Sequence, residues 1–169
     1  MSTELLTIEQ VIASAIDSSV QNTFQMMVGS DIEKIEASEF TGAASLDSES
    51  PCWLISLDWQ GKISGTVVLL LDKNSALQWS SKILGMDDNI PDEDVLDAAK
   101  ELGNLVAGGA KSQLDQFDLS MSVPKMHPPG SELQCELIEN AEIICHYQSE
   151  GIQLSVYGVV HDQCIGSES

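Results

Sequence analysis

The polar residues with the most suggestive spacing in this sequence belong to one segment near the middle of the chain. They recur at the spacing of one face of an α-helix: Asp94, Asp97, Glu101, Asn104, Gly108 and Lys111. Asn is a poor residue for a helix interior because its side chain competes for backbone hydrogen bonds. The segment also holds Gly103, Gly108 and Gly109, and each glycine costs about 1 kcal/mol relative to alanine. These costs favour a binding or reactive face, although a plain solvated face is the alternative.

The opposite side of the same segment fixes its orientation. Small or apolar residues repeat along it: Val95, Ala98 or Ala99, Leu102, Leu105 or Val106, and Gly109. We therefore predict a helix from Pro91 to Leu114 with this side on a core. Glu101 and Asn104 then point outward as neighbours one turn apart. Gly108 lies one turn beyond Asn104 and removes side-chain bulk where another surface could approach.

Two further helices are predicted. Residues 8–28 carry apolar residues at helical spacing, and Thr7 with Gln10 forms a capping-box pattern before them. Gly29 follows as a C-cap. A shorter helix is expected over residues 74–84, with Asn74 as its N-cap.

Strands are predicted where apolar residues alternate between turn signals. They form a hairpin over residues 52–72, with a turn at Gln60-Gly61 and a returning strand over 63–71. Further strands are expected over 119–123, 141–147 and 152–160, with a weak strand in 31–50 that holds Ile35 and Phe40. The run 67–71 is apolar on both faces, which indicates a central strand. Prolines and Gly130 predict a loop over 124–130.

This order of elements predicts an α/β fold of the α+β type. Residues 1–169 form a single domain, with a core of about 8–160, a mainly antiparallel sheet and long helices packed on it. The tail 161–169 is expected to be loose.

Composition excludes several classes of function. The chain has 169 residues, and 27 Asp and Glu against 7 Lys and Arg give a net charge of −20. That balance argues against nucleic-acid binding and against anionic membrane surfaces, which both need clustered cations. The apolar run 67–71 is far shorter than the ~20 residues of a membrane-spanning helix. Residues 1–10 carry no Lys or Arg of a secretory signal, so we expect a cytoplasmic protein.

No cofactor signature is visible. The four cysteines have no C-x-x-C spacing, and reduced thiols are expected, although their even number allows two disulfides: Cys52, Cys135, Cys145 and Cys164. The three histidines lack metal-ligand spacing, so no metal site is predicted: His127, His146 and His161. Glycine-rich phosphate-binding motifs are absent from the sequence. The tryptophans are expected in the core or at its edge: Trp53, Trp59 and Trp79.

The central segment resembles the active-site helix of the CheX, CheC and FliY family of response-regulator phosphatases. Asp97-x-x-x-Glu101-x-x-Asn104 looks like that family's D/S-x3-E-x2-N motif, and Lys111 matches its trailing lysine. The layout before it is also similar, with a long helix, a hairpin and a short helix ending in Leu84-Gly85-Met86. The resemblance covers about residues 8–160. A single E-x-x-N makes the chain closer to CheX than to the doubled CheC arrangement, and its acidity and the tail after Pro129 depart from the family.

The resemblance implies a phosphatase that hydrolyses the phospho-aspartate of a CheY-like receiver domain. In that role Asn104 orients the attacking water and Glu101 pairs with the receiver's lysine. Asp97, Gly108 and Lys111 belong to the docking surface. The protein needs no cofactor of its own, because the receiver supplies the Mg²⁺ that holds its phosphoryl group.

The resemblance also implies a homodimer.

One alternative to a phosphatase is a non-catalytic binding module that docks a receiver domain or a motor-switch protein. A third reading is a degenerate domain that serves only in dimerisation.

Overall fold

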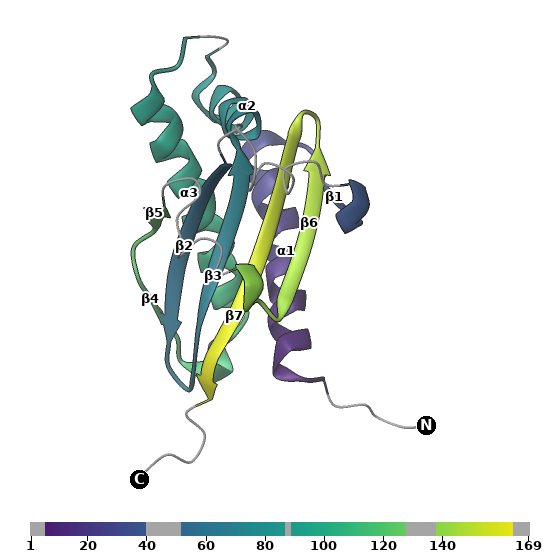
Figure 1. Cartoon of the computed structure of the whole chain (residues 1–169), viewed down its shortest axis with the longest axis vertical. Coiled ribbons are helices and arrows are strands. Elements are labelled where there is room, and N and C mark those ends of the chain that lie inside the picture. Colours follow the sequence, from purple (N-terminus) through teal and green to yellow (C-terminus); the bar gives the residue numbers. More distant parts are fainter. Residues whose placement is uncertain (1–5, 40–51, 87–88, 128–137, 164–169) are drawn as a thin grey trace.

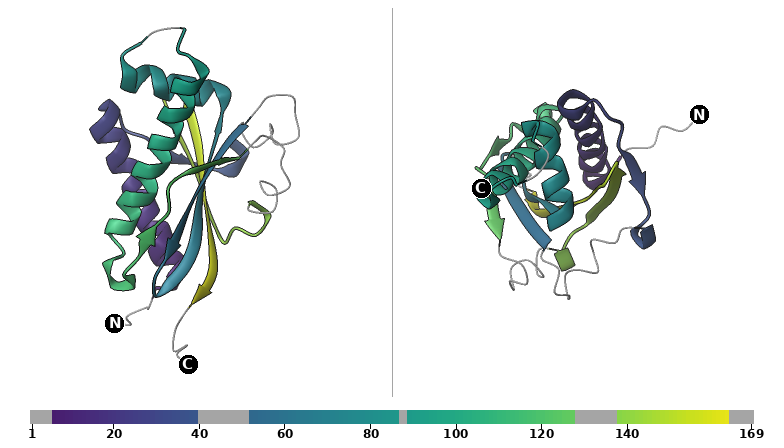
Figure 2. Two further views of the ribbon diagram at one scale, coloured as in Figure 1. Left: turned by 90° about the vertical axis from the view of Figure 1, so that its left-hand side faces the viewer. Right: turned by 90° about the horizontal axis from the view of Figure 1, so that it is seen from above.

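The computed structural model describes residues 6–39, 52–86, 89–127 and 138–163 and places three long helices on one face of an antiparallel β-sheet (Figure 1, Figure 2). The α-helices of the described residues are α1 (Ile8–Val28), α2 (Lys73–Leu84) and α3 (Asp92–Ser112), and short 3-10 turns cover η1 (Ala37–Glu39) and η3 (Asp115–Phe117). The strands are β1 (Glu33–Ile35), β2 (Cys52–Gln60), β3 (Ile63–Asp72), β4 (Ser120–Met121), β5 (Lys125–His127), β6 (Ile143–Ser149) and β7 (Ile152–Gln163). The predicted single-domain α+β fold is confirmed.

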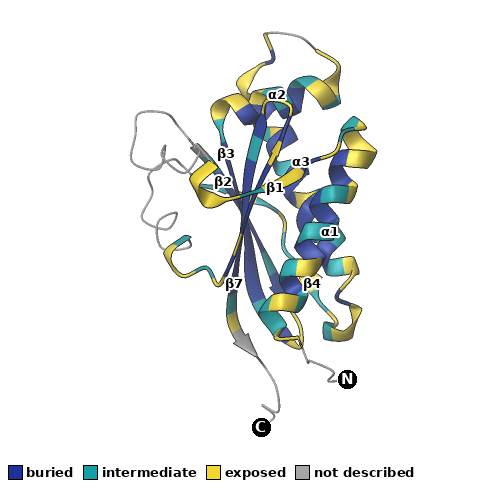
Figure 3. Cartoon of the chain, turned by 90° about the vertical axis from the view of Figure 1, so that its right-hand side faces the viewer, coloured by how far each residue is buried: buried dark blue, intermediate teal, exposed yellow. Residues whose placement is uncertain are grey.

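The sheet has seven strands in the order β1-β6-β7-β3-β2-β4, and β5 also pairs with β2. Strand β3 lies between β7 and β2 and is the predicted central strand, since all of Val67–Leu71 is buried. Because side chains alternate between the faces of a strand, Val67, Leu69 and Leu71 join the core under the helices. Val68 and Leu70 belong to a second, smaller cluster on the other face. Figure 3 shows that the middle of the sheet is buried, whereas the helices are exposed on their outer sides.

The predicted caps of α1 are confirmed. The Gln10 amide donates to the Thr7 hydroxyl, and the Gln10 side chain accepts from the Thr7 amide, so the capping box is complete. Gly29 ends the helix in the left-handed conformation, with φ of 66°, which glycine adopts without strain.

The predicted cap of α2 is wrong. Strand β3 runs directly into α2, and Asp72 is the N-cap, because the Ser75 amide donates to its carboxylate at 2.7 Å. Asn74 lies inside the first turn. The helix ends at Leu84 as expected, but Leu77 and Leu84 are exposed, and Trp79 is its large buried residue.

The edge strands also differ from the prediction. The strand expected over 119–123 is reduced to β4, which has two residues. Residues 125–127, predicted as loop, form β5 and pair with β2. In the C-terminal hairpin, β6 starts at Ile143 rather than at residue 141, and β7 extends to Gln163, beyond the predicted start of the loose tail.

The remaining predictions concern side chains. Trp59 and Trp79 are buried and Trp53 is half-buried, as expected. Cys145 is a buried free thiol, and burial raises its pKa. Phe40, Cys135 and Cys164 lie outside the described residues, as does the side chain of Cys52. Among the described residues, no helix combines the length and apolarity that crossing a membrane requires.

Candidate functional site

Helix α3 is held firmly against the rest of the domain, which gives its outward face a fixed orientation. It begins at Asp92 after Pro91 and ends at Ser112, slightly inside the predicted limits of Pro91 and Leu114. The Trp79 indole on α2 donates to the Ala98 carbonyl at 2.8 Å. On the sheet side, a Cβ built at Gly103 would lie only 3.0 Å from Ile55, so the missing side chain permits close packing on β2.

A second close approach joins α3 to α1, which runs antiparallel to it. A Cβ at Gly109 would overlap the Ser19 hydroxyl, so only glycine allows this helix pair to pack as it does. The Ser19 hydroxyl donates to the Val106 carbonyl at 2.7 Å. One turn away, the Gln113 side chain donates to the Ala15 carbonyl at 3.5 Å. Two glycines of the segment are therefore explained by packing.

The predicted outward stripe of α3 is present. Asp97, Glu101 and Asn104 are exposed, while Gly108 and Lys111 are half-buried. The predicted core side is buried at Val95, Ala98, Ala99, Leu102 and Val106, whereas Gly109 is half-buried. Three residues beyond the prediction are also buried: Gly103, Ala107 and Ala110. The structure thus brings Glu101 and Asn104 together one turn apart on a helix whose other side is anchored.

The polar side chains of this outward face, the α3 stripe, are available to a partner. Within the described parts of the chain, the side chains of Asp97, Glu101, Asn104 and Lys111 make no hydrogen bond or ion pair. The two ion pairs among the described residues lie elsewhere, at Lys62–Asp118 and Lys125–Asp58. A carboxylate and a carboxamide held in this way can accept hydrogen bonds from a partner without first breaking internal ones.

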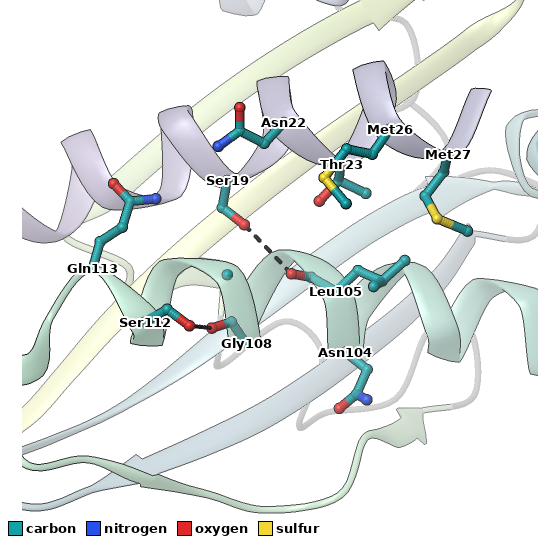
Figure 4. A pocket seen from close by; sticks show the side chains of 11 residues that line it. Ser19, Asn22, Thr23, Met26, Met27, Asn104, Leu105, Gly108, Ser112 and Gln113 are labelled. Carbon is teal, nitrogen blue, oxygen red and sulfur yellow. Dashed lines mark hydrogen bonds between the residues drawn. The ribbon is translucent and has the colours of Figure 1, made fainter. Parts of the chain in front are cut away.

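Gly108 differs from the other two glycines of α3. A Cβ added there would lie 3.6 Å from the Met121 methyl group on β4, which is an ordinary contact. The carbonyl of Gly108 accepts a hydrogen bond from the Ser112 hydroxyl at 3.1 Å (Figure 4). Packing therefore does not demand glycine at this position, in contrast to Gly109.

A groove of about 380 Å³ lies between α1 and α3 beside Asn104 (Figure 4). We call it the α1/α3 groove, and its lining is Ser19, Asn22, Thr23, Met26, Met27, Asn104, Leu105, Gly108, Gly109, Ser112 and Gln113. Met26 forms part of the α1 wall and is 81% exposed. Asn104 lies on the α3 rim, and its side chain is directed away from α1 (Figure 4).

The sequence prediction missed the α1 side of this groove. Asn22 and Met26 are exposed on the flank of α1 that faces α3, beside the buried Ser19 and Thr23. A methionine on an otherwise polar helix face was the available signal. Only the packing of α3 on α1 reveals that it lies near Asn104.

The histidines are distant from the α3 stripe. Each hydrogen bonds to a hydroxyl across the sheet, on the face opposite the helices: His127 to Ser56, His161 to Thr66 and His146 to Ser155. Burial lowers the pKa of His146, and burial together with the Lys125 charge lowers that of His127. Among the described residues, His, Cys, Asp and Glu side chains form no group of three or more that could hold a metal.

Known structures share this fold. The CheX protein of Vibrio vulnificus superposes with a TM-score of 0.70 at 19% identity, covering 92% of this chain and 100% of that one. CheX in the CheX-CheY-BeF3-Mg²⁺ complex of Borrelia burgdorferi gives a TM-score of 0.63 at 18% identity, over 88% of this chain and 97% of that one. FliY of Thermotoga maritima gives 0.63 at 19% identity, over 94% and 92% of the two chains. At such identities these likenesses show the fold alone.

Family membership rests on the sequence itself. No curated protein sequence matches the chain. The family model described as chemotaxis phosphatase CheX matches residues 54–147, which is more than half of the chain. The match covers β3, α2 and α3 completely and most of β2 and β6. The matched region contains the whole α3 stripe together with the strands that anchor it. The chain therefore belongs to the CheX family.

Proposed function

We propose that this protein hydrolyses the phospho-aspartate of a CheY-like receiver domain. The observation that carries the proposal is the pair Glu101 and Asn104, exposed and unengaged on the anchored helix α3. Two comparisons support it. The matching family model is that of a chemotaxis phosphatase, and the Borrelia burgdorferi relative is named as part of a complex with CheY.

Asn104 orients the attacking water in this proposal. Hydrolysis of an acyl phosphate consumes one water and releases inorganic phosphate and a free carboxylate. Its transition state depends mainly on placing the water in line with the leaving carboxylate. The carboxamide oxygen of Asn104 accepts a hydrogen bond from this water without adding negative charge beside the phosphoryl oxygens. A carboxylate at the same position would repel them.

Glu101 sets the register between the two proteins. It lies one turn before Asn104 and pairs with a lysine of the receiver, so that the ion pair aligns α3 over the phosphoryl group. Asp97, Gly108 and Lys111 extend the docking face along the same stripe. The receiver brings the Mg²⁺ bound to its phosphoryl group, and the phosphatase adds no metal of its own.

Loss of phosphoryl label from purified receiver domains tests the proposal. The wild-type protein is expected to accelerate this loss, and Asn104→Ala should reduce the maximal rate on the order of 10²-fold or more, because a water-positioning group acts mainly in the transition state. Receiver affinity should change little. A folded Asn104→Ala protein with the wild-type rate would remove Asn104 from the chemistry.

A non-catalytic docking module is the second candidate, since structures with this fold include FliY and a FliM middle domain as well as CheX. The same assay separates the two. A protein that binds receivers tightly and leaves the phosphoryl half-life unchanged is a binding module. Sedimentation or light scattering of the isolated protein tests the proposed homodimer.

A further inference from the structure

The α1/α3 groove shares a residue with the proposed reaction centre. Asn104 forms part of the α3 rim of the groove, although its side chain is directed away from α1, so a receiver that presents its phosphoryl group to Asn104 docks beside this rim. An interface of ordinary size buries about 800 Å² on each partner, which is wide enough to extend from Asn104 over α3 to α1. The groove is therefore continuous with the proposed receiver interface.

The lining of the groove is uncharged. None of its eleven described residues is Asp, Glu, Lys or Arg, in a chain with 27 acidic residues and a net charge of −20. The carboxylates of α3 lie outside this lining, at Glu101 and Asp97 and in the first turn of the helix at Asp92, Glu93 and Asp94. A neutral surface next to Asn104 admits an anionic phosphoryl group and its surroundings without the repulsion that carboxylates would cause.

The groove suits an apolar side chain. The Ser19 hydroxyl on its floor already donates a hydrogen bond to the Val106 carbonyl at 2.7 Å, so it requires no polar group from a partner. Its wall carries Met26 and Met27, which are 81% and 39% exposed. Methionine is flexible and polarisable and adapts to the shape of an apolar partner. A volume of about 380 Å³ is within the range of about 300–1,000 Å³ typical of ligand pockets, which is ample for one large side chain.

We propose that the α1/α3 groove selects the receiver by taking one large apolar side chain from the segment beside the phospho-aspartate, with Met26 as its adaptable wall. This inference rests on the proposed function and adds a recognition element to the same site. Asn104 and Glu101 act on the phosphoryl group and its lysine, and Met26 determines which receivers reach them.

The test compares three substitutions at the end of α1. Met26→Glu places a charge in the groove and Met26→Leu keeps an apolar wall. Gln25→Glu adds the same charge to the same exposed helix turn but outside the groove lining, so it controls for net charge and for the helix dipole. Thermal melts establish that all three proteins remain folded.

Two measurements are made with receiver domains. The first is the Kd for receivers loaded with beryllofluoride and Mg²⁺, a stable substitute for the phosphoryl group. The second is the KM and kcat for loss of phosphoryl label. Met26→Glu is expected to raise Kd and KM about tenfold or more, the loss typical of a truncated or charged interface anchor. Its kcat at saturating receiver should remain within about twofold, because Asn104 is untouched. Met26→Leu and Gln25→Glu should behave as wild type.

The outcomes distinguish the two levels of the proposal. Wild-type Kd and KM in Met26→Glu, with phosphatase activity intact, overturn the role of the groove and leave the proposed function standing. An equal loss in Gln25→Glu also overturns it, because the effect is then one of net charge. A change in oligomeric state without a change in receiver affinity assigns the groove to a second copy of the chain. Binding sensitive to Met26→Glu without any phosphatase activity supports the groove and rejects the proposed hydrolysis.

Discussion

Glu101 and Asn104 have different proposed roles: Asn104 positions a water molecule, and Glu101 forms an ion pair with the receiver. Asn104 is neutral and acts over one hydrogen bond, so its effect is confined to the reacting water. Glu101 is charged and exposed, and its pairing with a receiver lysine is therefore sensitive to ionic strength. The two roles predict different kinetic signatures from neighbouring residues of one helix.

Substitution of Glu101 should affect binding first. Glu101→Ala is expected to weaken receiver affinity, and Glu101→Lys should weaken it further because it places like charges together. Added NaCl should reduce wild-type affinity and should have less effect on Glu101→Ala. Titrations of receiver at two salt concentrations provide the measurement. Full affinity in Glu101→Lys, together with salt-independent wild-type binding, would contradict the ion pair.

The adjacent glycines of α3 provide a matched pair for separating docking from packing. Gly108→Ala should raise the free energy of unfolding by about 1 kcal/mol, since alanine is the better helix former and its Cβ meets only the Met121 methyl group. Gly109→Ala should lower it, because its Cβ overlaps Ser19. Denaturant unfolding checks both values.

A bulkier residue at position 108 tests receiver binding rather than stability. Gly108→Leu projects a side chain from the docking face at the edge of the α1/α3 groove, so receiver affinity should fall while the fold persists. A strongly destabilised Gly108→Ala would instead place this residue in the core.

At the scale of the elements, the sequence predicts helix ends and helix faces well where residues close together in the chain determine them. The capping box at Thr7 and the glycine after Val28 are encoded within a few residues, and both ends of α1 were predicted correctly. The outward stripe of α3 followed from its apolar periodicity, so the exposure of Glu101 and Asn104 was predictable as well. Their roles in catalysis stay a prediction.

Errors arose where distant residues decide the structure. Strand β5 exists because residues 125–127 pair with β2, which lies about seventy residues earlier in the chain. The sequence around residues 125–127 does not indicate this pairing. The cap of α2 was misplaced because Asp72 ends a strand and caps a helix at once. The α1/α3 groove could not be predicted for the same reason, since Met26 and Asn104 line one groove only after α1 packs on α3.

The corrected cap of α2 is testable. Asp72→Ala removes the carboxylate that accepts from the Ser75 amide, and the loss of an N-cap should cost about 1 kcal/mol of stability. Asn74→Ala should be nearly neutral because Asn74 lies within the first turn. Urea unfolding of both variants compares them directly. A larger effect at Asn74 would restore the cap predicted from the sequence.

For the whole molecule, the two faces of the sheet differ in their groups: one face carries the proposed docking residues, and the other carries the histidines whose protonation affects stability. The helical face carries the α3 stripe, whereas the opposite face holds hydroxyl–histidine pairs around the cluster of Leu54, Val68, Leu70 and Tyr157. Burial lowers the pKa of His146, so the folded protein binds a proton less readily than the unfolded chain, whose histidines titrate near 6.5. Acidification should therefore weaken this face first.

The pH dependence of stability tests this difference. The stabilisation from neutral His146 is fully present above the unfolded pKa and is lost as the pH falls below it. Wild type should lose more unfolding free energy between pH 7.5 and 5.5 than His146→Gln, and acidification relieves the repulsion of the many carboxylates in both proteins alike. Urea titrations at each pH measure the difference. Parallel pH curves for the two proteins would contradict the linkage.

The contact between Ser19 and Gly109 joins two helices that are far apart in the chain, and this arrangement has an evolutionary consequence. If α3 performs the reaction and α1 chooses the partner, substitutions on α1 can redirect the enzyme without loss of turnover. A duplicated copy of the gene could then acquire a new receiver through a series of active intermediates. Families built on this helix pair would diversify at positions such as Asn22 and Met26, while Gly109 between the helices stays fixed.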